Sequence, residues 1–200
     1  MMTKKTKIFN LAQITRQDKE YIAAALLNGK TAILPTDTVY GLTVFAKREF
    51  LPALNEAKNN PQDKPAQILC SKHTAQKLAL PSKGLEKALN IWPAALTAVL
   101  AATPCGKALS GLDTVGLRVP DSSFLADIFK LCGGALYASS ANLHNLPNLE
   151  KQADITKVFT GRVDIIVTDG DLYAKPSAVI DFTVLPPKII RKGLLTEKIL

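Results

Sequence analysis

Five polar clusters, each next to an apolar run, contain the residues whose types and spacing could do chemistry. They are Pro35–Leu42, Lys58–Pro65, Thr114–Pro120, Ser139–Asn142 and Lys175–Val179, with Arg191 shortly after the last. These clusters supply hydroxyls, amides and cations, whereas the chain has only two histidines and no local signature of a catalytic triad surrounds either. Such groups bind and orient anions rather than attack covalently. We therefore expect a binding site in which no side chain acts as a covalent nucleophile.

Arg118 carries the most specific signal among these clusters. It follows Val115 and Leu117 in a run that otherwise predicts a buried strand. A buried guanidinium needs an anionic partner, because an unpaired charge in an apolar environment costs a large free energy. That partner is either an internal Asp or Glu or a substrate carboxylate bound bidentately, and the sequence leaves both open. For each other cluster, a turn, a helix cap or a solvated basic face is the ordinary alternative.

Composition and motif searches exclude several other kinds of site. The cysteines Cys70, Cys105 and Cys132 are odd in number and far apart, so the chain has neither a disulfide framework nor a CxxC motif. We find no P-loop, no dinucleotide-binding fingerprint and no metal-ligand motif. Because the chain has no recognisable secretory leader and no apolar stretch of about 20 residues, we expect a cytoplasmic protein that does not enter a membrane.

The net charge favours anionic partners. The chain has 25 Lys and Arg against 17 Asp and Glu, which gives a formal charge of +8. An excess of this size favours nucleotides, polyphosphates, RNA or anionic membrane surfaces. Charge alone does not choose among these ligands.

The elements that must position the clusters alternate between helices and strands. Thr15 and Asp18 have the spacing of a capping box, and helical periodicity then continues to Gly29. The apolar run 31–34 ends at Pro35 and predicts a buried strand, and another strand follows the polar loop after it. Further strands are predicted at 67–70, 96–101, 115–119, 135–138, 163–167, 179–182 and 189–190, and helices at about 50–57, 74–78, 84–91, 124–131 and 155–159. This alternation favours an α/β sheet with helices on both faces. Because the sequence has no internal repeat and no linker rich in Gly or Ser, we expect a single domain.

The clusters, in this order, resemble the YrdC family, the threonylcarbamoyl-AMP synthases, from about Gln17 to Gly193. The matching stretches are ILPTDTVYGL, AKNNPQDKP, IWPAALTAVL, GLDTVGLRVP, ASSANL, GRVDIIVTDGD, KPSAVIDFT and PPKIIRKG. Several independent motifs in the correct order are a stronger signal than a single glycine pattern. The resemblance implies a single YrdC-like domain over residues 1–200 with its core at about 15–193, and with a twisted mixed β-sheet flanked by helices and a large positively charged cleft. Because the sequence stops soon after IIRKG, it resembles the short form of the family, and we expect it to lack the extra C-terminal domain of longer relatives.

The resemblance also implies a reaction and a set of site residues. Members of the family condense L-threonine, bicarbonate and ATP into threonylcarbamoyl-AMP and release pyrophosphate, and Mg²⁺ is expected with the ATP. Partner proteins then move the threonylcarbamoyl group to a tRNA adenosine. By motif, threonine binding is implied for Thr38, Arg118 and Ala138, and ATP binding for Lys58, Asn60, Lys64, Thr114, Ser140, Asn142, Asn148, Ser177 and Arg191. Among these, Lys58 and Arg191 are expected to act electrostatically on the phosphates.

The chain departs from the family pattern at several positions. Asn60 stands where the family has Arg, Leu69 where many relatives have His, and Ala178 where Thr is common. The missing guanidinium leaves an alternative function open, that of a diverged paralogue that binds RNA or a nucleotide without this synthase activity. Transfer RNA or double-stranded RNA would then be held through its phosphates. Recognition by base stacking is less favoured, because only 6% of the residues are aromatic.

Overall fold

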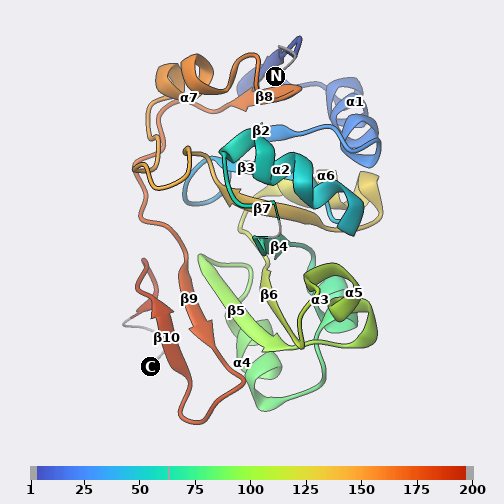
Figure 1. The fold of residues 1–200 in the computed structure, drawn as a ribbon, viewed down its shortest axis with the longest axis vertical. Helices are drawn as coiled ribbons and strands as arrows, with labels where there is room; N and C mark the ends of the chain where they lie inside the picture. The colour runs from blue at the N-terminus through green and yellow to red at the C-terminus, as the bar shows by residue number, and fades with distance from the viewer. Residues whose placement is uncertain (1–3, 63, 197–200) are drawn as a thin grey trace.

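The computed structural model describes residues 4–62 and 64–196. In this part of the chain the strands form one ten-stranded mixed sheet in the order β1-β8-β2-β3-β7-β4-β6-β5-β9-β10 (Figure 1). The strands are β1 (Lys7–Asn10), β2 (Ala32–Leu34), β3 (Gly41–Phe45), β4 (Gln67–Leu69), β5 (Leu96–Ala101), β6 (Thr114–Arg118), β7 (Leu136–Ser140), β8 (Ile165–Thr168), β9 (Ala178–Asp181) and β10 (Lys188–Arg191). The mixed α/β fold predicted from the sequence is therefore confirmed.

Helices pack on both faces of this sheet. They are α1 (Arg16–Leu27), α2 (Leu51–Lys58), α3 (Lys72–Leu78), α4 (Lys83–Ile91), α5 (Pro104–Ser110), α6 (Ser123–Cys132) and α7 (Gln152–Phe159), with the short 3-10 helices η1 (Leu11–Gln13) and η2 (Arg48–Phe50). Within the described residues, no helix is both long enough and apolar enough to cross a bilayer.

The first helix begins and ends where the sequence predicts. The Thr15 hydroxyl accepts a hydrogen bond from the Asp18 backbone N–H at 3.1 Å, and the Asp18 carboxylate accepts one from the Thr15 N–H at 3.0 Å. This reciprocal capping box satisfies two N–H groups that a helix otherwise leaves unpaired. At the other end, Gly29 has a φ of 74°, a conformation that side chains with a Cβ rarely adopt.

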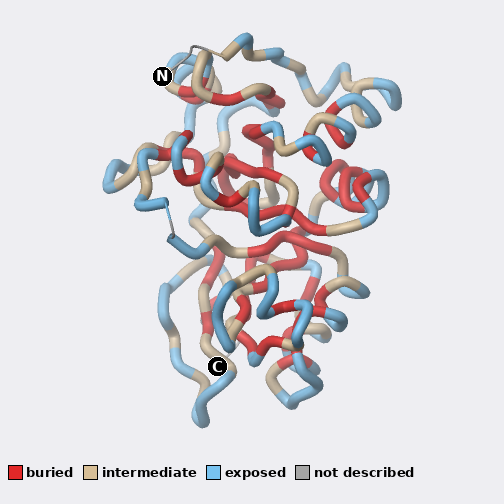
Figure 2. Tube along the Cα trace, turned by 45° about the vertical axis from the view of Figure 1, so that its right-hand side comes forward, coloured by how far each residue is buried: buried red, intermediate tan, exposed pale blue. Residues whose placement is uncertain are grey.

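The alternation of side chains along the strands separates two hydrophobic clusters. Ala32 and Leu34 of β2 pack in the cluster beneath α1 and α6, whereas Ile33 between them belongs to the cluster that includes α2 and α7. This second cluster continues under α3 and α4 onto β5 and β6, so buried segments run through both ends of the molecule (Figure 2). The cluster beneath α1 and α6 does not reach β6, β5 or β9. Consequently, one face of those three strands is left for the site.

Two elements were missed from the sequence. Strand β1 pairs in parallel with β8 and lies before the predicted core of 15–193, because Lys7–Asn10 is mostly exposed and lacks the apolar alternation that marks a strand. Helix α5 could have been predicted from the sequence, because the Thr103 side chain caps it and Pro104 is its first residue. The sheet therefore begins earlier in the chain than the sequence suggested.

Candidate functional site

A cleft lies on the uncovered face of the sheet. It comprises a cavity of about 340 Å³ over β5, β6 and β9 and a smaller one of about 30 Å³ beside the loop that follows β2. Both cavities are lined by Gln67, Ala138, Ser139, Ser140 and Arg191, so they form one continuous hollow. Among the described residues that line the two cavities there is no carboxylate. The cleft is therefore suited to an anionic ligand.

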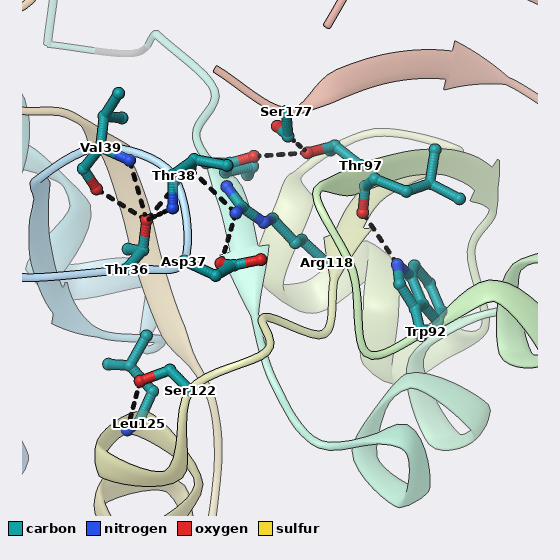
Figure 3. Close-up of polar contacts among 12 residues, drawn as sticks. Thr36, Asp37, Thr38, Val39, Trp92, Thr97, Arg118, Ser122, Leu125 and Ser177 are labelled. Carbon is teal, nitrogen blue, oxygen red and sulfur yellow. Dashed lines mark hydrogen bonds and ion pairs between the residues drawn. The ribbon is translucent and has the colours of Figure 1, made fainter. Parts of the chain in front are cut away.

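Arg118 at the end of β6 forms one end of the cleft. Its side chain is 3% exposed, and Nη2 donates to the Asp37 carboxylate and, at 2.9 Å, to the Thr38 hydroxyl (Figure 3). Burial lowers the pKa of Arg118, and the adjacent Asp37 opposes that shift. An internal carboxylate partner, one of the two alternatives that the sequence left open, is therefore present. Nη1 makes no hydrogen bond to a described residue, and Arg118 lines the smaller cavity.

The loop after β2 is fixed by the hydroxyl of Thr36. This oxygen accepts hydrogen bonds from the backbone N–H groups of Thr38 and Val39, at 3.1 and 3.2 Å, and donates to the Val39 carbonyl at 2.6 Å (Figure 3). A side-chain turn of this kind holds the backbone without a regular element. It positions Asp37 and Thr38 against Arg118.

Lys58, the last residue of α2, forms the second buried cation of the site. Its Nζ donates to the Ser140 carbonyl, to the Ser140 hydroxyl at 3.1 Å and to Asn142 Oδ1 at 2.8 Å. The amide of Asn142 is oriented for this contact, because its Nδ2 donates to the backbone carbonyls of Leu143 and Leu146. Lys58 thus reaches the cleft through Ser140, which lines both cavities.

The charge environment of Lys58 is unusual for a lysine. Burial, together with the positive charges of Lys64 and Arg191, lowers its pKa to about 8. All its hydrogen-bond acceptors are neutral oxygens. An anionic ligand would supply the missing counter-charge.

Asn60 and Lys64 lie on the loop after α2. Asn60 Nδ2 donates to Asn55 Oδ1 at 3.2 Å, and Lys64 Nζ is 3.5 Å from both Asn60 Oδ1 and His144 Nδ1. Lys64 is exposed, so its ammonium is accessible to a ligand. The cation of Lys64 therefore lies beside the position where the family pattern has a guanidinium.

Arg191 and Ser177 meet at the other side of the cleft, and they lead to two residues that the sequence analysis missed. Arg191 Nη2 is 3.1 Å from the Ser177 hydroxyl, which is 2.9 Å from Thr97 Oγ1, and Thr97 in turn donates to Gln67 Oε1 at 2.8 Å. Figure 3 shows Thr97 and Ser177 facing one another. Thr97 and Gln67 are polar residues inside otherwise apolar strands, and that was the available signal.

The structure brings most of the predicted site residues to the cleft. Six of them line its two cavities, namely Thr114, Arg118, Ala138, Ser140, Ser177 and Arg191. Thr38, Lys58 and Asn142 line neither cavity but hydrogen-bond to Arg118 or Ser140, which do. Asn60, Lys64 and Asn148 neither line the cleft nor hydrogen-bond to a described residue that lines it.

A larger cavity, of about 730 Å³, lies elsewhere, between α3 and α6. Among its lining residues Cys70 has the only thiol, and burial raises the pKa of that thiol to about 12, so it is not a thiolate at neutral pH. None of the predicted site residues lines this cavity. No cluster of three or more His, Cys, Asp or Glu suited to a metal ion occurs in the described part of the chain. The cleft on the sheet is therefore the candidate site.

Known proteins are similar to this chain over most of its length. The model of the Sua5/YciO/YrdC family, described as telomere recombination, matches residues 24–193. A threonylcarbamoyl-AMP synthase of Pyrococcus abyssi is 32% identical over 196 residues, which is 94% of this chain and 58% of that protein. The crystal structure of P. abyssi Sua5 complexed with L-threonine has a TM-score of 0.85 at 30% identity, covering 94% of this chain and 57% of that one.

The chain thus spans a little over half the length of the P. abyssi protein. E. coli YciO has a TM-score of 0.83 and covers 96% of this chain and 98% of its own, although at 18% identity it supports the fold alone. The family match extends over most of the ten-stranded sheet, from within α1 to beyond β10. On this evidence the chain belongs to the Sua5/YciO/YrdC family.

Proposed function

We propose that this chain is a threonylcarbamoyl-AMP synthase, which condenses L-threonine, bicarbonate and ATP into threonylcarbamoyl-AMP and pyrophosphate. The observation that carries the proposal is that two buried cations lie beside one cleft. Arg118, which bonds to Thr38, and Ser140, which accepts from Lys58, line the same cavity. The 32% identity to a protein of that name, and the L-threonine complex of a similar structure, support the same substrate.

The amino acid would occupy the smaller cavity. There Nη1 of Arg118 is available for the threonine carboxylate, and the hydroxyl of Thr38 lies beside the guanidinium. Ala138 leaves space for a ligand in this cavity because its side chain is a single methyl group. A carboxylate bound to a buried guanidinium forms a charge-assisted hydrogen bond, which is about twice as strong as a neutral one.

ATP would occupy the larger cavity. Ser140 and Arg191, which line it, would bind phosphate oxygens, as would Lys58 next to Ser140 and Ser177 next to Arg191. Thr114 also lines this cavity. The exposed ammonium of Lys64 adds a further cation near the phosphates. Mg²⁺ would come with the nucleotide, coordinated by phosphates and water, because none of the described residues lining the cleft is a carboxylate.

The chemistry needs positioning and charge rather than a protein nucleophile. The neutral amine of threonine takes up the carbon of bicarbonate to form a carbamate, with loss of water. A carbamate oxygen then forms a bond to the α-phosphorus of ATP while the bond to pyrophosphate breaks. Both partners are anions, so the cleft must neutralise their repulsion and align them, and buried cations at both ends do so.

The product would be a reactive intermediate that a later reaction consumes. An acyl adenylate is a reactive mixed anhydride, and the threonylcarbamoyl group would pass to a tRNA adenosine with the help of partner proteins. Because direct RNA binding has no specific support in the cleft, we do not favour RNA binding as the main function.

The decisive experiment measures pyrophosphate release from ATP with and without L-threonine and bicarbonate. Release that requires both additions is expected from the wild-type chain, and Lys58→Met should reduce it about 10²- to 10³-fold, the range measured when one electrostatic donor is removed from a transition state. Lys87→Met, which removes an exposed lysine on α4, should retain wild-type rates. Release that does not respond to threonine and bicarbonate would refute the proposal.

A further inference from the structure

Gln67 lies at the junction of the two cavities and lines both. It is the first residue of β4 and pairs with Ala138 of β7. Gly116, on the neighbouring strand β6, also lines the larger cavity, and a Cβ built there would meet nothing closer than Thr97 Cγ2 at 3.9 Å. Gln67 therefore stands between two small residues, with open space beside it.

The position of Gln67 Oε1 against Thr97 determines the directions of the neighbouring hydrogen bonds. Gln67 Oε1 can accept but not donate, so the single hydroxyl proton of Thr97 must point to it. Thr97 Oγ1 must then accept from Ser177, whose own oxygen accepts from the Arg191 guanidinium. The donors thus run in one direction, from Arg191 to Gln67.

This series of hydrogen bonds leaves the nitrogen of the Gln67 amide without a partner among the described residues. Gln67 Nε2 makes no hydrogen bond to any residue that the structure describes, although its two N–H groups are donors. With Oε1 held by Thr97, Nε2 is the end of the amide left for a ligand in the cleft. Leu69, two residues later on the same face of β4, is fully buried and has no polar atom to offer.

We propose that Gln67 Nε2 donates to a planar CO₂-type oxyanion, namely bicarbonate and the carbamate made from it, at the junction of the two cavities. The inference rests on the proposed function, since that reaction brings such a group between the amino acid and the α-phosphate. A neutral amide suits this place, because it binds an oxyanion without adding another cation beside Lys58 and Arg191. Gln67 would thus be a positioning residue for the carboxyl group being transferred.

The test is the dependence of the rate on bicarbonate at saturating ATP and threonine. Gln67→Leu should raise the KM for bicarbonate about tenfold or more, as expected for loss of a hydrogen bond to a charged group. The KM values for ATP and threonine should change less than about twofold, because their own contacts remain. Thr97→Val frees the amide to turn, so it should raise the bicarbonate KM by a smaller factor.

Gln76→Leu is the matched control, since Gln76 is exposed on α3 and lines none of these cavities. Calorimetric titration with threonine, in the presence and absence of bicarbonate, adds a readout that does not depend on turnover. An unchanged bicarbonate KM, or an equal rise in all three KM values, overturns the assignment of Gln67 while the synthase function stands. A wild-type chain without threonine-dependent pyrophosphate release overturns both.

Discussion

The two ends of the cleft each bury a cation, but they balance its charge differently. Arg118 has a carboxylate partner, Asp37, within the protein. Lys58 has neutral acceptors, and the neighbouring charges that shift its pKa, Lys64 and Arg191, are themselves positive. In the proposed synthase, the amino-acid end, which contains Arg118, is thus compensated before a ligand binds, whereas the phosphate end, which contains Lys58, would receive its counter-charge from the ligand. This difference fits the proposed ligands, a single carboxylate at one end and a polyanion at the other.

Removing the internal counter-charge should have the largest effect on stability. Asp37→Asn leaves the Arg118 guanidinium, on a side chain that is 3% exposed, without an anion, and breaking a buried pair in this way typically costs about 3–5 kcal/mol. Urea unfolding measures the loss. The control is Asp113→Asn, which breaks a pair between two exposed side chains, Asp113 and Lys107, so a much smaller loss is expected there. Equal losses in the two variants would contradict the contrast between the ends.

ATP binding at the phosphate end should be accompanied by proton uptake, because Lys58 has no negatively charged partner there before ATP binds. Lys58 has a pKa of about 8 without ligand, and bound phosphates raise it, so ATP binding at a pH of about 8.5 takes up protons. ATP affinity should accordingly fall as the pH rises above about 8, by at most about tenfold per pH unit. Calorimetry in buffers of different ionisation enthalpy measures the protons. Lys58→Met should abolish this uptake; persistence of the full uptake in that variant would assign it to another group.

The smallest effect is expected where the family guanidinium is missing. Asn60→Arg should raise adenylate formation by less than about fivefold, because Lys64 already places a cation 3.5 Å from Asn60 Oδ1 and an exposed charge contributes little. Initial rates of pyrophosphate release measure the change, with Asn60→Gln as the uncharged control. A large gain would instead mean that Lys64 does not compensate and that the phosphate end is impaired.

Local features of the fold were predictable because their causes are local. The capping box at Thr15, the positive φ at Gly29 and the buried strand that ends at Pro35 all follow from neighbours within a few residues. Arg118 was also predicted to be buried and paired, because a charge within an apolar strand requires a partner. Its partner could not be identified, since Asp37 lies far away in the sequence and reaches it through a loop.

The floor of the cleft could not be predicted in this way. Gln67 and Thr97 looked like isolated polar residues in apolar strands, and their role depends on which face of the sheet has no helix on it. That face is determined by the strand order, which places β4 between β7 and β6. Asn148, Asn60 and Lys64 are suggested by motif position and lie outside the lining of both cavities, so their assignment to the site stays a prediction.

Strand β4 also has a consequence for how the protein folds. It has only three residues, and it joins the two parts of the sheet through pairings distant in sequence, Gln67 with Ala138 and Ile68 with Leu117. Contacts of such sequence separation require large loops to close, which slows folding relative to local helices. The cleft floor is therefore complete only when these pairings have formed. In a refolding experiment, recovery of ATP binding would follow the closing of the sheet rather than the earlier gain of helix.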